Sequence, residues 1–171
     1  MKFYALAAIM LITFSAIADA QNKSAYTTTN AKTCRTIKST FEGTGSYEGE
    51  CRGMGGYRIR LIEGDIRQTM DIITPRKKRF ELRFWNLYSS FSSIGDKLEW
   101  RILNGRPVAM IARYNVADPE NSEKNTSYLL VSRIGQTVSC VTDVVAPGPD
   151  QNAKARVLAD QASSKPCKIS K

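Results

Sequence analysis

An Asn-Gly pair between two alternating segments constrains the fold of this chain more than any other feature. From Leu98 to Ile102 apolar residues alternate with charged ones, and beyond Asn104-Gly105 a period of two resumes as far as Tyr114. Asn and Gly tolerate the positive φ angles of a type I′ turn, and a period of two is typical of a strand with one buried face. The sequence therefore predicts an antiparallel hairpin here and a fold built mainly of β-strands.

Residues 1–20 have the layout of a secretory signal peptide. Lys2 precedes an apolar run, and small residues occupy the −3 and −1 positions before Gln21. The run is about as long as the shortest membrane-spanning helix, so an anchor is the alternative, but the A-x-A pattern directly after it favours cleavage. We predict a periplasmic or secreted protein without a transmembrane segment. Cleavage removes one Lys and one Asp, so the net charge stays at +9.

All four cysteines follow the predicted cleavage site, and an even number in an oxidising compartment predicts two disulfides. Three pairings are possible. We favour Cys34–Cys51 and Cys140–Cys167, because each encloses a local segment, and each would stabilise the fold by about 3–4 kcal/mol. A metal site of four thiolates is disfavoured, because no two cysteines have the C-x2–4-C spacing.

The rest of the chain predicts one domain over 34–171, preceded by a flexible leader over 21–33 that is polar and has no periodicity. Glycines and prolines separate about seven to nine short alternating segments, one of them from Phe80 to Tyr88. The glycine cluster Gly53–Gly56 predicts a tight turn or bulge, because a strand follows it and not the helix of a phosphate-binding loop.

The last part of the domain changes character. Residues 150–164 are rich in Ala with helical spacing, Asp150 is the expected N-cap, and Pro166 stops the helix. The predicted fold is thus a single antiparallel β-domain, a small barrel or sandwich, closed by a C-terminal α-helix.

Several motifs resemble a group of small exported proteins from alphaproteobacteria that carry four cysteines. The motifs are Cys51-x-Gly-Met-Gly-Gly-Tyr57, Glu63-Gly64-Asp65-Ile66-Arg67, Leu98-Glu99-Trp100-Arg101, and the segments of Cys140 and Cys167 around an Ala-rich helix. The likeness extends over most of the chain after the signal peptide. It implies a periplasmic location and a four-cysteine framework, and it gives no catalytic residue.

The composition argues against an enzyme. The chain has no His, which removes Ser-His-Asp and Cys-His arrangements and most Zn or Cu sites. Paired cysteines leave no thiolate nucleophile. Carboxylates remain, but Glu63 and Asp65 flank a turn glycine, and Glu99 has Arg101 beside it for a surface ion pair. We predict no catalytic residue, no metal and no cofactor.

The best indication of function is a basic run followed by aromatic residues. The candidate binding residues are Arg76, Lys77, Lys78, Arg79, Arg83 and Trp85. Cations beside aromatic rings suit an anionic envelope lipid or glycan, or an acidic protein surface, and in an exported protein these are better candidates than nucleic acid. The same run also fits a solvated loop that keeps the domain soluble. The alternative function is an envelope-support, protein-interaction or inhibitor-like domain without a polymer ligand.

Overall fold

The computed structural model describes residues 22–43 and 45–168 of the chain. The predicted signal peptide, residues 1–20, lies outside the described residues, so its cleavage stays a prediction. Within the described ranges, no helix is long and apolar enough to cross a membrane.

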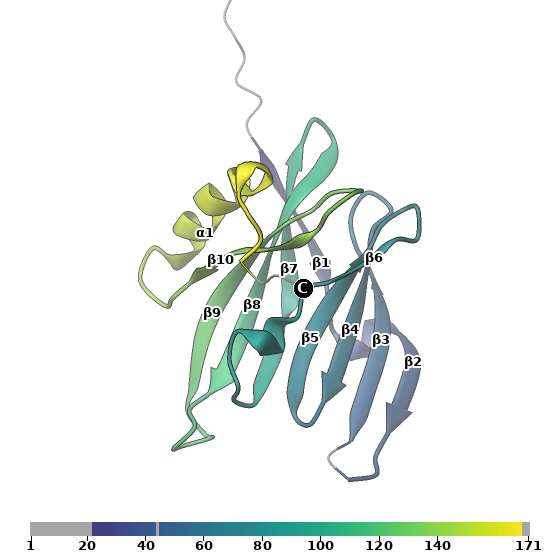
Figure 1. Cartoon of the computed structure of the whole chain (residues 1–171), viewed down its shortest axis with the longest axis vertical. Helices are drawn as coiled ribbons and strands as arrows, with labels where there is room; N and C mark the ends of the chain where they lie inside the picture. Colours follow the sequence, from purple (N-terminus) through teal and green to yellow (C-terminus); the bar gives the residue numbers. More distant parts are fainter. Residues whose placement is uncertain (1–21, 44, 169–171) are drawn as a thin grey trace, which may run out of the picture.

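In the described part of the chain, ten strands form one sheet, and a single α-helix follows them (Figure 1). The strands are β1 (Lys23–Thr28), β2 (Arg35–Thr40), β3 (Ser46–Arg52), β4 (Arg58–Gly64), β5 (Arg67–Ile73), β6 (Arg79–Glu81), β7 (Ser92–Leu103), β8 (Arg106–Ala117), β9 (Asn125–Arg133) and β10 (Cys140–Val145). The helix is α1 (Gln151–Asp160), and the short 3₁₀ segments are η1 (Ala31–Thr33), η2 (Phe84–Asn86) and η3 (Ala162–Ser164). The strand order is β10-β9-β8-β7-β5-β4-β3-β2, with β1 beside β7 and β6 beside β5.

The sheet consists of two halves that are connected by very little strand pairing. Strands β5 and β7 run parallel and pair only at Arg67 and Ser92, because β1 takes the edge of β7 from Lys97 to Ile102. Figure 1 shows β7, β8 and β9 in one half and β2 to β5 in the other. The mainly β fold with one C-terminal α-helix is confirmed. The predicted barrel or sandwich is not confirmed, because the described strands form one sheet that does not close, and there are ten of them.

Both halves bury their apolar faces in a common core. The largest fully buried side chains include Trp100 and Tyr114 from one half and Ile59, Met70 and Ile72 from the other. Burying a large apolar side chain contributes about 1.5–3 kcal/mol, so this shared core holds the halves together despite the weak strand pairing.

The helix α1 covers the opposite face of β8 and β9. Ala155 and Ala159 are buried there against Ile111 and Val131. Alanine side chains allow the helix backbone to approach the sheet closely, which explains the Ala-rich composition of this segment. The helix is shorter than the predicted 150–164, since it ends at Asp160 and a 3₁₀ turn follows.

The central hairpin is confirmed. Leu103 pairs with Arg106, which leaves Asn104 and Gly105 as the two turn residues, with φ angles of 50° and 75°. Both values are the positive angles that a type I′ turn requires.

The two disulfides have the predicted pairing. Cys34 bonds Cys51 and Cys140 bonds Cys167, with sequence separations of 17 and 27 residues. The first joins Cys34, the residue directly before β2, to β3, and the second fixes the segment after the helix to β10.

The predicted flexible leader over 21–33 is wrong for most of its length, because Lys23–Thr28 forms β1 and Ala31–Thr33 forms η1. The sequence of β1 is polar and gave no periodic signal. Its order comes from backbone pairing with β7 and from Arg101. This buried guanidinium bonds Asp160 of α1 through Nε at 2.7 Å and the carbonyl oxygen of Asn22 at 2.9 Å.

Arg101 was expected to form a surface ion pair with Glu99. The two side chains are 3.7 Å apart, but each has a closer partner on α1, because the helix covers this face. Glu99 accepts from Arg156 Nε at 2.7 Å, and Arg101 pairs with Asp160. Together these contacts bind β7 to α1, and Ser24 of β1 joins them because its hydroxyl donates to Glu99 Oε1 at 2.5 Å.

The predicted strand from Phe80 to Tyr88 is also wrong beyond Glu81. Arg83 has a left-handed backbone with φ of 51°, which ends the strand, and η2 follows at once. The backbone N–H of Phe84 then donates to Thr69 Oγ1 at 2.8 Å, so a side chain of β5 fixes the change of direction.

Candidate functional site

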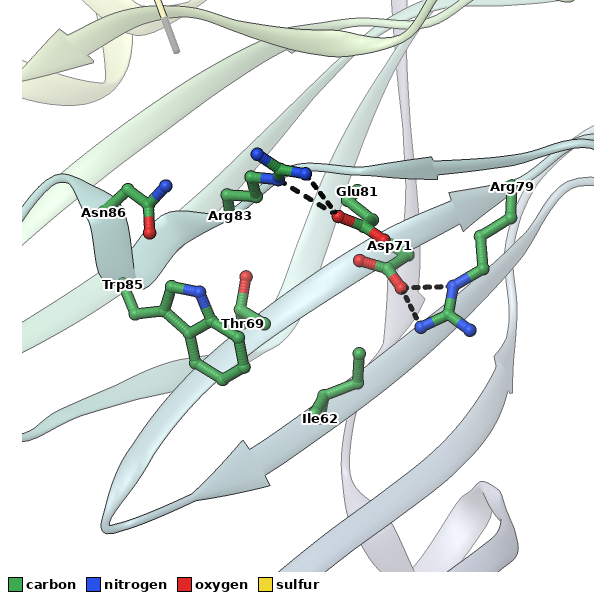
Figure 2. A pocket seen from close by; sticks show the side chains of 8 residues that line it. All are labelled: Ile62, Thr69, Asp71, Arg79, Glu81, Arg83, Trp85 and Asn86. Carbon is green, nitrogen blue, oxygen red and sulfur yellow. Dashed lines mark hydrogen bonds and ion pairs between the residues drawn. The ribbon is translucent and has the colours of Figure 1, made fainter. Parts of the chain in front are cut away.

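A polar groove follows β6 and η2, and its central part lies on the face of β4 and β5 that points away from the core. Its central pocket has a volume of about 400 Å³ (Figure 2). A neighbouring pocket of about 560 Å³ shares Arg79, Glu81 and Arg83 with it, and another of about 440 Å³ shares Trp85 and Asn86. We call these three adjoining pockets the β6 groove. The central pocket is lined by Ile62, Thr69, Asp71, Arg79, Glu81, Arg83, Trp85 and Asn86.

Strand alternation places two carboxylates in this groove. In β5, Met70 and Ile72 point into the core, so Thr69 and Asp71 face the other way. Strand β6 pairs with β5 so that Asp71 lies opposite Glu81. Directly opposite residues of an antiparallel pair lie about 5 Å apart, so the two acids occupy one site.

The left-handed residue Arg83 positions the aromatic side of the groove. It turns the chain so that Phe84 is fully buried in the core while Trp85 is half-buried at the pocket wall. A left-handed conformation costs a non-glycine residue roughly 1–2 kcal/mol. Such strain persists where the surrounding contacts demand it and is frequent at ligand sites.

Each carboxylate in the pocket is paired with an arginine. Arg79 contacts Asp71 at 2.5 Å, and Arg83 contacts Glu81 at 2.9 Å. In both pairs two guanidinium nitrogens meet a single carboxylate oxygen, as Figure 2 shows. No side chain or backbone group of the described chain donates to the second oxygen of either carboxylate, and that of Asp71 faces the pocket in Figure 2.

Asp71 is almost completely buried, and this affects its protonation. Burial raises the pKa of Asp71 above its ordinary value, although the hydrogen bond and the charge of Arg79 act in the opposite direction. Arg79 therefore favours the ionised form of this buried carboxyl group, against the effect of burial.

The arrangement suits a ligand with many hydroxyl groups. The second carboxylate oxygens accept hydrogen bonds, the guanidinium groups donate them, and Asn86 offers both functions. The indole of Trp85 adds an apolar face beside these polar groups. Such a combination is chemically suited to a sugar ring, whose faces are partly apolar and whose edge carries hydroxyls.

The structure brings together three of the predicted binding residues and separates the others. Arg79, Arg83 and Trp85 line the central pocket. Lys78 lines the adjoining one, where its Nζ lies over the Phe80 ring at 4.8 Å and donates to the Thr137 carbonyl oxygen at 3.2 Å.

Arg76 and Lys77 are exposed in the β5–β6 turn, and neither lines the β6 groove. Lys77 has a left-handed φ of 64° at the apex. The basic run therefore does not form one surface patch, since the turn places Arg76 and Lys77 outside the groove that Lys78 and Arg79 line.

Five residues of the central pocket were not predicted from the sequence: Ile62, Thr69, Asp71, Glu81 and Asn86. Asp71 had a usable signal, because it is the one charged residue in the otherwise apolar end of a strand, Met70 to Ile73. No signal in the sequence indicated that Thr69 and Asn86 belong to the pocket, since their positions depend on how η2 folds over β5.

Among the described residues, no group of three or more His, Cys, Asp or Glu side chains is placed to hold a metal ion. No family model, no curated protein and no solved structure matches this chain. The interpretation of the site therefore depends on its geometry.

Proposed function

We propose that this protein is a non-catalytic binding domain of the cell envelope, periplasmic or secreted, that holds an acidic glycan in the β6 groove. The observation that supports it most is the position of Trp85 beside two arginine–carboxylate pairs that keep unused hydrogen-bonding atoms. The two disulfides are compatible with an oxidising compartment.

The charge of the groove favours moderate acidity in the ligand. Arg67, Arg79 and Arg83 each pair with a carboxylate, at distances of 2.5–2.9 Å. Lys78 has no carboxylate partner in the described part of the chain. The net charge of +9 attracts anions over a longer range, and this attraction weakens with salt. Hydroxyl contacts and Trp85 therefore supply most of the affinity, and charge supplies a salt-dependent part.

Isothermal titration calorimetry with phosphate-free uronic-acid oligosaccharides tests the proposal, with neutral maltoheptaose as the reference ligand. We expect Trp85→Ala and Arg83→Gln each to weaken binding of the acidic glycan roughly tenfold, because each removes a contact that defines the pocket. Arg52→Gln is the matched control for charge, since Arg52 is exposed on β3 and makes no ion pair among the described residues.

Binding of the acidic glycan should weaken as salt rises from about 0.05 M to 0.5 M, and the Arg52→Gln variant should behave as the parent protein does. If neither glycan binds, or if Trp85→Ala binds as the parent protein does, the groove is not the site. Replacing all four residues of the basic run would be a poorer test, because the loss of Arg79 leaves the buried Asp71 without its partner.

The β2 edge favours a second candidate, a protein-interaction domain. Strand β2 ends the sheet, and Ile37 within it and Phe41 directly after it are exposed, Phe41 by 94%. An extended segment of a partner protein can pair with such an edge. If a pull-down from an envelope extract loses its partner on Phe41→Ser but not on Trp85→Ala, this candidate is favoured over the glycan.

A further inference from the structure

A separate pocket of about 530 Å³ lies where four turns meet. The turns connect β3 to β4, β5 to β6, β7 to β8 and β9 to β10. Tyr57, Arg76 and Gln136 come from the first, second and fourth of these turns, and Arg106 is the first residue of β8, directly after the third. We call it the four-turn pocket. Trp85, Arg79 and Arg83 do not line it, so its occupant is independent of a ligand in the β6 groove.

The turns around this pocket are fixed by their own hydrogen bonds. The Lys77 N–H donates to the Thr74 carbonyl oxygen at 2.8 Å, which holds the turn that carries Arg76. Gln136 Nε2 donates to the Tyr57 hydroxyl at 3.0 Å and joins two of the turns directly. A pocket held in this way loses little conformational freedom when a ligand binds.

The charge distinguishes this pocket from the others. Arg76 and Arg106 line it, and neither makes an ion pair within the described ranges. No Asp or Glu lines it, whereas each of four other pockets in the structure has at least one carboxylate. The pocket therefore presents two positive charges that the protein itself does not neutralise.

The rest of the lining is largely apolar. Tyr57, Pro107 and Ile134 are buried at the pocket, and glycines at positions 55, 105 and 135 also line it. A volume of this size with an apolar lining and a few convergent polar groups is typical of small-molecule sites. It is much larger than a single phosphate or carboxylate group needs.

We propose that the four-turn pocket binds a phosphorylated small molecule, with the phosphate between Arg76 and Arg106 and a ring-sized carbon skeleton over the Tyr57 side. A phosphate monoester carries about −1.5 to −2 charges at neutral pH, which matches two guanidinium groups, whereas a carboxylate matches one. Its three terminal oxygens also accept from two guanidinium forks at once.

Titration of the ¹⁵N-labelled protein, followed by NMR, tests this assignment with glucose 1-phosphate, inorganic phosphate and phosphatidic acid vesicles as probes. We expect glucose 1-phosphate to shift the amide signals of Gly55, Gly105 and Gly135, and to bind more tightly than inorganic phosphate. Arg76→Gln and Arg106→Gln should each weaken binding roughly tenfold, because a charged hydrogen-bond donor is lost.

Two controls make the outcome specific. Arg52→Gln changes the net charge equally at an exposed site and should leave the affinity unchanged, and Trp85→Ala should leave it unchanged because it alters only the β6 groove. Binding should also fall roughly tenfold from about pH 8 to pH 5, because the phosphate takes up a proton near pH 6. Sulfate keeps both charges over this range and should show no such fall.

Results of three kinds would overturn the proposal. The first is the absence of shifts at the three pocket glycines with every probe. The second is equal weakening by Arg52→Gln and Arg76→Gln, which would indicate a general charge effect. The third is binding to the vesicles alone, or equal affinity for inorganic phosphate and glucose 1-phosphate, either of which excludes a small molecule held by its carbon skeleton.

Discussion

Replacing Arg101 by Met should destabilise the protein more than any exposed arginine replacement. The Arg101 side chain is 8% exposed, and its guanidinium bonds Asp160 twice, at 2.7 and 2.9 Å, as well as Ser24 and the Asn22 carbonyl oxygen. Breaking a buried ion pair costs about 3–5 kcal/mol when the remaining charge stays buried. The Asp160 side chain is 35% exposed and can regain water, so we expect a loss of about 2–3 kcal/mol.

This loss is measurable by urea unfolding and by a fall in Tm of roughly 4–12 °C for a chain of this size. The double-mutant cycle with Asp160→Asn should give a coupling energy of about 1–2 kcal/mol. Arg52→Met is the matched control and should cost less than about 0.5 kcal/mol, because Arg52 is exposed.

The same pair predicts a pH effect of defined sign. Burial alone would raise the pKa of Asp160, but hydrogen bonds from Arg101 and Asn22 and the charge of Arg101 outweigh it and hold this pKa below its ordinary value. A lowered pKa in the folded state contributes stability above the unfolded pKa of about 3.9, and this is lost as pH falls through the folded value. Arg101→Met should therefore lose less stability on acidification than the parent protein.

The reasoning fails if Arg101→Met costs less than about 1 kcal/mol, or if the coupling energy with Asp160 is zero within error. Either result would mean that β1 and α1 are held by backbone pairing and apolar contacts alone.

Two further predictions concern the disulfides and one turn. From loops of 17 and 27 residues, the chain-entropy relation gives about 3.1 kcal/mol for Cys34–Cys51 and about 3.5 kcal/mol for Cys140–Cys167. Urea unfolding of each Cys→Ser double variant should show these losses, and a loss under about 1 kcal/mol would contradict the loop argument. Ile66 is a β-branched residue with φ of 55° in the β4–β5 turn, so Ile66→Asn should stabilise by about 1 kcal/mol, while Ile66→Val should not. An unchanged or lowered Tm in Ile66→Asn would show that no strain is relieved there.

Local signals predicted much of the fold. The Asn104-Gly105 turn could be predicted from the sequence because positive φ angles restrict the residue types that fit. The cysteine pairing could be predicted because short loops bring the paired cysteines together. In contrast, β1 was missed because an edge strand with polar side chains leaves no periodic pattern. Its partner β7 lies far away in the sequence, so only the tertiary structure supplies its hydrogen bonds.

The candidate site shows the same division. The sequence indicated a basic run with aromatic residues, and three of its members, Arg79, Arg83 and Trp85, do line one pocket. It gave no sign that Arg76 would leave this group, because that depends on the direction of a turn.

By itself, then, the sequence determined the β-rich class, the central hairpin and the excess of positive charge, and it favoured the disulfide pairing that the structure has. Each of these depends on residue type or on contacts between neighbours along the chain. Only the tertiary structure decided which charges are neutralised: Arg79 by Asp71, Arg101 by Asp160, and Arg76 and Arg106 by no carboxylate of the described chain. The physical reason is that ion pairing depends on distances across strands and turns, and these are set by sheet register and by packing of the shared core.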